Sequence, residues 1–281
     1  MKNDNKKSIT WLITGCSTGL GRSIAQEVLK SGYSAVITSR NVKDIQDIAD
    51  AYPDTALALS LDVSDRGQID DVTKQAEAKF NNIDVLINNA GYGFRGAVEE
   101  ASEGEMRKIF DTNFFGTVSM IQAVLPGMRK NKSGTIMNLS SIGGRFGPVG
   151  SGYYSATKFA IEGLSDSLRK EVGSLGIRIV LVEPGAFRTD FGGRSLNTSK
   201  KIIADYEPTV GPRRTEPSNG KQPGEPKKAA QVLIKTFEQA NVPFRLLLGT
   251  DAIKIIRDEL DAQYKELEAW EKVSITTNFE G

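Results

Sequence analysis

Histidine is absent from this chain of 281 residues, and Cys16 is its one cysteine. The absence of histidine excludes a Ser-His-Asp triad, a Cys-His pair and every His-ligated metal site. A single thiol excludes an internal disulfide, a structural zinc cluster and an iron–sulfur centre. Any catalysis by this chain must therefore use Ser, Tyr, Lys, Asp, Glu or Arg side chains, or a bound cofactor.

Long hydrophobic runs and an excess of one charge are missing as well. No stretch approaches about 18 apolar residues, so we expect no membrane span. The basic start of the chain is followed by too few apolar residues for a secretory signal, and together with the single cysteine this favours a cytoplasmic protein. Lys and Arg total 36 against 35 for Asp and Glu, a formal net charge of +1, so we expect no nucleic-acid partner.

Short apolar runs alternate with longer amphipathic segments over the first 190 residues. Val, Ile and Leu dominate the runs, as in strands that are buried on both faces of a sheet. The expected strands are Ser8–Thr14, Ser34–Ser39, Ala56–Asp62, Asp84–Asn88, Gly134–Ser140, Ile177–Val182 and Phe244–Leu248. The expected helices are Gly21–Lys30, Val42–Ala51, Arg66–Phe80, Glu103–Arg129, Tyr154–Leu175, Lys227–Gln239 and Asp251–Lys272. This alternation predicts an α/β fold with a parallel sheet and helices on both faces.

Residues 192–226 interrupt this rhythm and hold five of the ten prolines and five glycines. A loop of this length in a compact domain is usually a lid or a binding segment, and the alternative is a disordered linker. We interpret it as a substrate-loop insertion, because a helix and a strand follow it. The whole chain, 1–281, is then expected to be a single dinucleotide-binding and catalytic domain.

Glycines gather where the first expected strand meets the first expected helix, in Thr14-Gly-Cys-Ser-Thr-Gly-Leu-Gly21. They permit a tight turn, a close approach of the backbone to a pyrophosphate, and close helix packing. The helix N-terminus then offers free N–H groups to the anion. The alternative is a purely structural turn. The predicted phosphate site consists of Gly15, Ser17, Thr18, Gly19, Leu20 and Gly21.

The second expected strand ends in Thr38-Ser-Arg-Asn41, where an NAD site normally places a carboxylate for the ribose 2′-hydroxyl. The nearest carboxylate, Asp44, lies inside the following expected helix. Arg40 is suited instead to a 2′-phosphate, with a hydrogen bond from Ser39. This end of the site therefore favours NADP (NADPH) over NAD, unless Arg40 is only a solvated surface charge.

Four further motifs follow in order along the chain. The sequence Asn-Asn89-Ala90-Gly91 closes the fourth expected strand, Asn113 lies in the next long helix, and Ser141 follows the fifth strand. Tyr154 and Lys158 open the next helix, and Ser141 precedes Tyr154 by 13 residues. With the glycine-rich turn, these motifs resemble the short-chain dehydrogenase/reductase superfamily in its single-domain branch, over nearly the whole chain. The segments 91–94, 183–189 and 248–252 are similar to the branch of 17β-hydroxysteroid and retinol dehydrogenases.

The resemblance implies a doubly wound Rossmann-type sheet of about seven strands in the order 3-2-1-4-5-6-7. It also implies the role of each matching residue. Asp62 and Val63 would lie beside the adenine, Asn89, Ala90 and Gly91 along the adenine-side ribose, and Pro184, Gly185 and Thr189 around the nicotinamide. The catalytic group would be Asn113, Ser141, Tyr154 and Lys158, in which Lys158 also binds the nicotinamide ribose and Asn113 completes a proton relay through a water.

Tyr154 and Lys158 stand at positions i and i+4, which places both on one face of a helix. A free tyrosine has a pKa of about 10, so lowering it to about 7 requires roughly 4 kcal/mol. An ammonium about 4 Å away supplies roughly this amount at an effective dielectric of about 20, whereas desolvation opposes it. We therefore expect Tyr154 to act as general acid and base, with Ser141 holding the substrate oxygen.

The leading hypothesis is an NADP(H)-dependent oxidoreductase that transfers a hydride between the nicotinamide and a secondary alcohol or ketone. The first alternative is a catalytically silent NADP(H)-binding regulator, and the second is an epimerase or dehydratase of similar fold. Phe94, Phe146, Val149, Phe187 and Phe191 suggest an apolar cavity for an apolar or amphipathic substrate, although Arg95, Arg145 and Arg188 leave an anionic one open. The apolar faces of the two long helices suggest a homodimer or homotetramer.

Overall fold

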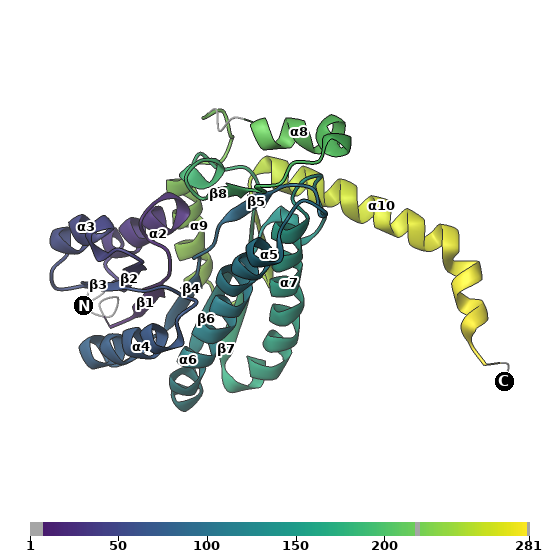
Figure 1. Cartoon of the computed structure of the whole chain (residues 1–281). Helices are drawn as coiled ribbons and strands as arrows, with labels where there is room; N and C mark the ends of the chain where they lie inside the picture. Colours follow the sequence, from purple (N-terminus) through teal and green to yellow (C-terminus); the bar gives the residue numbers. More distant parts are fainter. Residues whose placement is uncertain (1–7, 217–219, 280–281) are drawn as a thin grey trace.

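The computed structural model describes residues 8–216 and 220–279 and confirms the predicted α/β class. Seven strands form one parallel sheet in the order β3-β2-β1-β4-β6-β7-β9, as Figure 1 shows. Counted along the chain, this is the predicted order 3-2-1-4-5-6-7. The strands are β1 (Thr10–Ile13), β2 (Ser34–Ser39), β3 (Ala56–Ser60), β4 (Val85–Asn88), β6 (Gly134–Leu139), β7 (Ile177–Pro184) and β9 (Arg245–Leu248).

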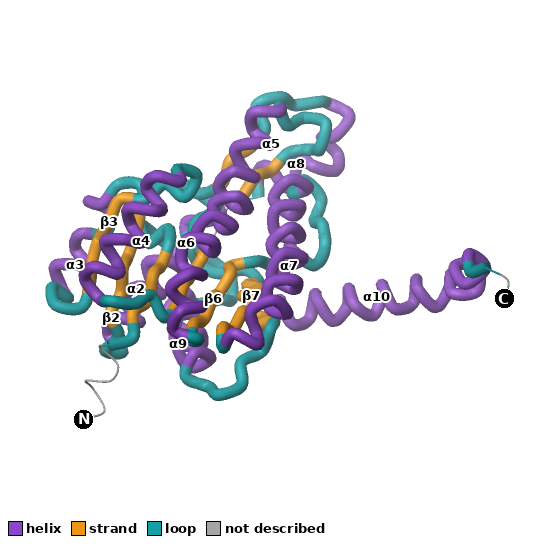
Figure 2. The backbone as a smooth tube through the Cα atoms, turned by 90° about the horizontal axis from the view of Figure 1, so that it is seen from below, coloured by secondary structure: helices purple, strands orange, loops and turns teal. Residues whose placement is uncertain are grey.

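Helices cover both faces of this sheet, which makes it doubly wound (Figure 2). One layer is formed by α2 (Gly19–Lys30), α3 (Gln46–Ala51) and α9 (Pro226–Phe237), and the other by α4 (Arg66–Phe80), α6 (Gly116–Asn131) and α7 (Gly152–Val172). Side chains alternate between the two cores, because successive residues of a strand point to opposite faces. Trp11 and Ile13 of β1 join the α2 and α9 layer, whereas Leu12 joins the α4 and α6 layer.

Two of the expected helices are divided in the structure. The expected helix Glu103–Arg129 consists of α5 (Glu103–Phe110) and α6, joined by a π-helical turn, Asp111–Phe115. The expected helix Val42–Ala51 is a 3₁₀ turn, Val42–Asp44, followed by α3. The π-helical turn carries Asn113, and such wide turns are frequent at functional sites.

Where the structure describes it, the segment 192–226 contains a short strand, a 3₁₀ turn and a helix. Its role as a substrate-loop insertion stays a prediction. Leu196–Thr198 forms β8, which pairs in parallel with β5 (Gly93–Arg95) to make a second, two-stranded sheet. The helix α8 (Glu207–Thr215) follows, and Arg214 on it pairs with the buried carboxylate of Glu100. β5 and β8 were not expected from the sequence, because strands of three residues are too short to show a period. The helix α8 was not expected either.

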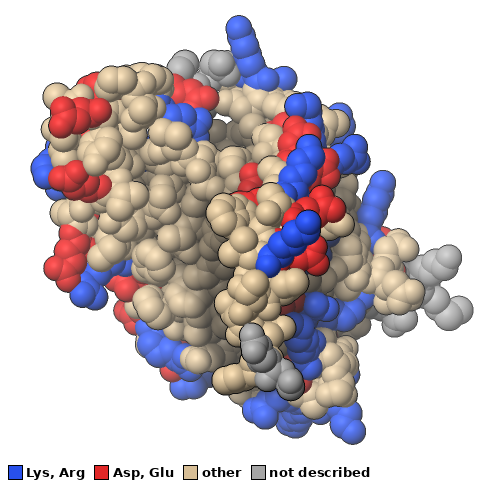
Figure 3. Space-filling model, turned by 90° about the vertical axis from the view of Figure 1, so that its right-hand side faces the viewer, with Lys and Arg blue, Asp and Glu red and all other residues tan. Residues whose placement is uncertain are grey.

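The last helix, α10 (Thr250–Ser274), projects from the rest of the chain, as Figures 1 and 2 show. Only Ala252 and Ile256 of this helix are buried. Lys and Arg side chains are interspersed with Asp and Glu on the face that Figure 3 presents. Within residues 8–216 and 220–279, no helix combines the length and the apolarity that crossing a membrane requires.

Candidate active site

A cleft of about 1060 Å³ lies at the carboxyl ends of the parallel strands, where open α/β sheets bind their ligands. It brings together residues from both the glycine-rich turn and the predicted catalytic group. The predicted residues that line it are Gly15, Ser17, Thr18, Gly19, Leu20, Ser39, Arg40, Asp62, Val63, Asn89, Ala90, Gly91, Ser141, Tyr154, Lys158, Pro184, Gly185 and Thr189. Gly21 and Asn113 were also predicted as site residues, but neither lines the cleft.

The glycine-rich turn requires glycine for conformation and for space. Gly15 has a φ of +73° and Gly19 a φ of +60°, a region that favours glycine. A Cβ atom on Gly21 would lie 2.2 Å from the carbonyl oxygen of Gly15, so Gly21 packs behind the turn. No side chain caps the N-terminus of α2, and its first turn holds no acidic residue. The free N–H groups at this helix end therefore fit an anionic diphosphate.

Thr14 and Asn89 hold this turn against the end of β4. The Asn89 side chain donates hydrogen bonds to the carbonyl oxygens of Thr14 and Gly15, at 2.8 and 3.0 Å. The Thr14 hydroxyl accepts hydrogen bonds from the backbone N–H groups of Asn89 and Ala90, both at 3.0 Å. Asn89 lines the cleft as expected. Its side-chain nitrogen also fixes the glycine-rich turn.

The far end of the cleft carries charges that sequence reasoning covered only in part. Arg40 is exposed at its rim, and its carbonyl oxygen accepts a hydrogen bond of 3.0 Å from Ser60. Burial alone would raise the pKa of Asp62, but hydrogen bonds from Ser64 and the charges of Arg40 and Lys108 hold that pKa below its usual range. Lys108 on α5 also lines the cleft and was missed, because the helical pattern around it gives it no distinguishing signal.

Tyr154 and Lys158 lie on α7, with Ser141 opposite them just after β6. The Lys158 ammonium nitrogen donates a hydrogen bond of 2.6 Å to the carbonyl oxygen of Leu139. The Ser141 hydroxyl oxygen accepts a hydrogen bond of 3.0 Å from the N–H of Gly143. The ring of Phe191 lies 5.7 Å from that of Tyr154 between centroids, and contributes an apolar wall.

Burial governs the titration of both side chains on α7. It raises the pKa of Tyr154 to about 12, although hydrogen bonding with Ser141 acts in the opposite direction. It lowers the pKa of Lys158 to about 8, while the charge of Glu162 acts to raise it. These directions correct the expectation that Lys158 brings the tyrosine pKa to near 7. In the protein by itself, the cost of desolvating a phenolate governs the pKa of Tyr154.

Asn113 is fully enclosed behind the cleft, and its side chain is committed to neighbours other than Lys158. Its Oδ1 accepts a hydrogen bond from the N–H of Tyr92, and its Nδ2 donates to the Tyr92 carbonyl at 2.9 Å and to the Thr157 hydroxyl at 3.3 Å. Asn113 therefore ties the π-helical turn to the segment after β4 and to α7. The local distortion expected at this residue is present. The expected relay from Asn113 to Lys158 through a water stays a prediction.

The substrate side of the cleft is more polar than expected. Phe146, Val149, Phe187 and Phe191 line it as predicted, whereas Phe94 is buried against Tyr153 and does not. Arg95, Arg145 and Arg188 do not line it either. The segment 192–226 contributes polar side chains to the wall, and α10 adds two residues that were missed. These wall residues are Arg194, Ser195, Asn197, Arg213, Gln222, Asp251 and Ile255.

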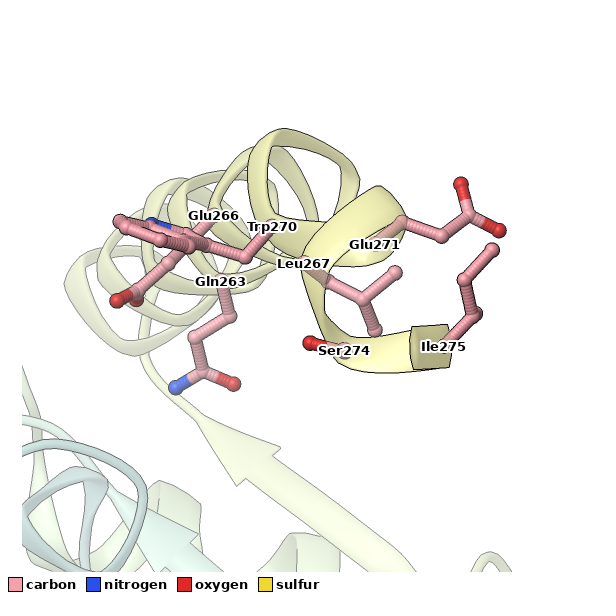
Figure 4. Close-up of a pocket in the computed structure, with 7 residues that line it drawn as sticks. All are labelled: Gln263, Glu266, Leu267, Trp270, Glu271, Ser274 and Ile275. Carbon is pink, nitrogen blue, oxygen red and sulfur yellow. The ribbon is translucent and has the colours of Figure 1, made fainter. Parts of the chain in front are cut away.

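A second hollow, of about 440 Å³, lies on the projecting part of α10 (Figure 4). Figure 4 shows side chains of this one helix and the turn that follows it, with Trp270, Leu267 and Ile275 on its wall. None of the predicted site residues belongs to it. Its open, single-helix construction contrasts with the cleft, which several strands and helices enclose.

The sheet, the glycine-rich turn and the Ser, Tyr and Lys group together define a nucleotide-dependent dehydrogenase or reductase. The model of the short chain dehydrogenase family matches residues 10–200. Oxidoreductase BOA17 of Botryotinia fuckeliana is 35% identical over 270 residues, covering 95% of this chain and 98% of that protein. Retinol dehydrogenase 8 of Homo sapiens is 38% identical over 195 residues, covering 66% of this chain and 61% of that protein.

Solved structures agree with this assignment. A short-chain dehydrogenase from Streptomyces avermitilis is 42% identical, with a TM-score of 0.91 over 96% of this chain and 99% of that one. A serine dehydrogenase solved with NADP⁺ is 25% identical, with a TM-score of 0.73 over 85% of this chain and 94% of that one. A Burkholderia phymatum relative of the same fold, solved with NAD, is 20% identical, with a TM-score of 0.80 over 92% and 96%. The chain belongs to the short-chain dehydrogenase/reductase family and is an NAD(P)-dependent oxidoreductase.

Proposed function

We propose that this protein is an NADP(H)-dependent oxidoreductase of secondary alcohols and ketones in which Tyr154 is the general acid and base. One observation carries the proposal: Ser141, Tyr154 and Lys158 line the same cleft as the glycine-rich turn, with Lys158 buried and Tyr154 partly buried within it. Removing an ammonium and part of a phenol from water costs free energy of folding, and apolar residues would meet a purely structural need better.

The cofactor preference rests on the end of β2. Arg40 stands at the cleft rim where a carboxylate would favour NAD, and Ser39 lies beside it. The Asp44 side chain accepts a hydrogen bond of 3.3 Å from Asn41, so it is partly engaged nearby. A guanidinium can pair with a phosphate through two parallel hydrogen bonds, which gives NADP an added charge-assisted contact.

The raised pKa of Tyr154 suits the reductive direction, in which the phenol donates a proton. At neutral pH the phenol is protonated, which is the form that can donate a proton to a carbonyl oxygen. Ser141 holds that oxygen by a hydrogen bond, and Lys158 binds the nicotinamide ribose and favours the phenolate that remains. A nicotinamide held in the cleft would supply the hydride in this direction and accept it in the other. Phe191 and the apolar wall exclude water around the reacting oxygen.

The test is a panel of ketones and secondary alcohols with NADPH or NADP⁺, followed by the absorbance of the reduced nicotinamide. We expect turnover by the natural chain, with stoichiometric use of the cofactor, and none by Tyr154→Phe. NADPH should still bind to that variant, because only the phenolic oxygen is lost. Turnover by Tyr154→Phe at the natural rate would refute the assignment of Tyr154.

Two other functions are disfavoured by particular features. A silent regulator predicts a defective catalytic group, yet Ser141, Tyr154 and Lys158 are all present and line one cleft. An epimerase or dehydratase predicts a product that forms without net use of the cofactor. Cofactor consumed in proportion to product distinguishes the oxidoreductase from both.

The substrate we infer is apolar or amphipathic, since Phe146, Phe187 and Phe191 face a wall that also bears Arg194 and Arg213. The human relative is a retinol dehydrogenase, and an apolar alcohol is consistent with that similarity. We further propose that residues 1–281 act as one catalytic domain in the cytoplasm. The segment 192–226 would form part of the substrate side of the cleft. The exposed Phe115 and Phe159 beside α6 and on α7 favour a homodimer or homotetramer.

A further inference from the structure

Four charged side chains meet behind the candidate catalytic group, outside the cleft. The Nη1 atom of Arg145 lies 3.3 Å from both carboxylate oxygens of Glu183. The Nε atom of Arg245 lies 3.0 Å from Glu162 and 3.3 Å from Glu183. Two carboxylates and two guanidiniums thus form one network, which we call the Arg145–Glu183 cluster.

The cluster connects the elements that carry or adjoin Ser141, Lys158 and Pro184. Arg145 ends the short 3₁₀ turn that follows Ser141, and Glu183 directly precedes Pro184 at the end of β7. Glu162 lies one helical turn beyond Lys158 on α7, while Arg245 begins β9 at the sheet edge. None of the four lines the cleft, so any effect on the reaction must pass through the residues that do.

Burial of these charges lowers the stability of the fold unless the ion pairs between the carboxylates and the guanidiniums are kept. The side chain of Glu183 is 0% exposed and that of Glu162 is 7% exposed, whereas those of Arg145 and Arg245 are 21% and 37% exposed. A buried carboxylate without its partner costs several kcal/mol, and apolar residues of similar volume often stabilise a fold equally well. Fold stability alone therefore gives little reason to place two buried carboxylates next to the catalytic group.

The turn that Arg145 anchors fits closely against α7. A Cβ atom on Gly144 would lie 2.6 Å from the Ser140 hydroxyl oxygen and 3.1 Å from Cγ of Glu162. A Cβ atom on Gly143 would lie 3.3 Å from the Tyr154 ring. The position of the Ser141 hydroxyl relative to Tyr154 thus depends on how firmly this turn is held.

We propose that Arg145 is a positioning residue, which holds the Ser141 turn at its working distance from Tyr154 by pairing with Glu183. This inference rests on the proposed function, because it gives Ser141 a role in turnover. Arg245 pairs with the same carboxylates from the edge strand, away from the turn, and so provides the matched control.

The experiment compares Arg145→Met, Arg145→Lys and Arg245→Met in the full chain, each with NADPH and the best ketone of the panel. We expect Arg145→Met to lower kcat by roughly 10- to 100-fold, the range of one misplaced hydrogen-bond donor, while the Kd for NADPH stays within about twofold. Arg145→Lys should recover part of kcat, since it keeps the charge. Arg245→Met should lower the unfolding temperature while kcat falls less than about threefold. Equal losses of kcat in the two Met variants would overturn the inference.

A double-mutant cycle tests whether Arg145 acts through Ser141. Arg145→Met should add no more than about a twofold loss of kcat to Ser141→Ala, whereas independent roles would multiply. A multiplicative loss would overturn the inference.

A third measurement does not depend on turnover, so it separates this inference from the proposed function. Hydrogen exchange of the backbone N–H groups of residues 141–146 should quicken in Arg145→Met but not in Arg245→Met. If the natural chain reduced no ketone, the proposed function would fail while this exchange still decided the positioning role. Unchanged exchange in Arg145→Met would overturn that role.

Discussion

The ammonium nitrogen of Lys158 lies 5.8 Å from the centre of the Tyr154 ring, one turn further along α7. Lys158 is buried and Tyr154 is partly buried, and the ammonium is anchored at 2.6 Å to the Leu139 carbonyl. The lysine is thus held by the end of β6 rather than by the phenol. This hydrogen bond fixes the Lys158 charge beside the tyrosine ring.

The pKa of Lys158, lowered by burial to about 8, predicts a pH-dependent affinity for NADPH. As pH rises through that value the ammonium loses its proton, so a charge-assisted hydrogen bond to the ribose becomes an ordinary one. We expect the affinity to fall by roughly tenfold across this range, which corresponds to about 1.4 kcal/mol. Fluorescence titration of NADPH at a series of pH values measures it. In Lys158→Met the same series should be flat, and a flat series for the natural chain would contradict the assignment.

Arg40 predicts which nicotinamide cofactor binds more tightly. Arg40→Ala should weaken NADPH by roughly tenfold or more and leave NADH almost unchanged, because only NADPH carries the phosphate that Arg40 would pair with. The matched control is Lys43→Ala, because Lys43 is exposed and lies in the 3₁₀ turn that follows β2. Calorimetry on both cofactors decides the question: equal affinities of the natural chain for NADPH and NADH would remove the phosphate assignment.

Gly21 predicts a steric effect in the nucleotide cradle. An alanine Cβ at this position would lie 2.2 Å from the Gly15 oxygen and 2.3 Å from Nδ2 of Asn89, so the turn must move. We expect Gly21→Ala to destabilise the fold by about 1–3 kcal/mol and to abolish measurable cofactor binding. Gly104→Ala is the control, since its Cβ meets nothing within 4 Å and helix propensity should make it neutral or stabilising. Chemical unfolding and NADPH titration measure both effects.

The sequence was sufficient for the features that local spacing determines. The buried strand runs predicted the sheet, and the glycines after β1 predicted the cradle, because only glycine fits the backbone of that turn. Tyr154 and Lys158 share a helix face at four residues' spacing, so a single helix was enough to bring them together. Family resemblance then supplied Ser141, which no spacing on its own helix could have placed beside them.

Features that depend on distant partners were not predictable in the same way. The hydrogen bonds of the Asn113 side chain to Tyr92 and Thr157 join three segments. No sequence pattern within any one of these segments predicts the hydrogen bonds. The pairing of β5 with β8 joins three-residue strands about 100 residues apart, too short to show a period. The upward shift in the pKa of Tyr154 depends on burial by the folded chain, so the sequence argument named desolvation as the opposing effect but could not give its size.

Glu183 predicts how stability depends on pH, independently of any substrate. Burial, and then the charge of Glu162, raise the pKa of Glu183 to about 7, while Arg145 and Arg245 oppose the shift. An unfolded glutamate titrates near pH 4.3, so between there and neutrality the folded chain binds more protons than the unfolded chain. Stability contributed by this group is therefore lost as pH rises through that window, by up to about 3 kcal/mol.

Glu183→Gln removes that titration while keeping the size of the side chain. The free energy of unfolding of the natural chain, measured in urea at about pH 5 and about pH 7.5, should fall relative to that of Glu183→Gln as pH rises. Glu171→Gln, at an exposed position on α7, should follow the natural chain. If the natural chain and Glu183→Gln kept a constant difference across this window, the Glu183 carboxylate would be ionised throughout. The two arginines would then outweigh burial in the Arg145–Glu183 cluster.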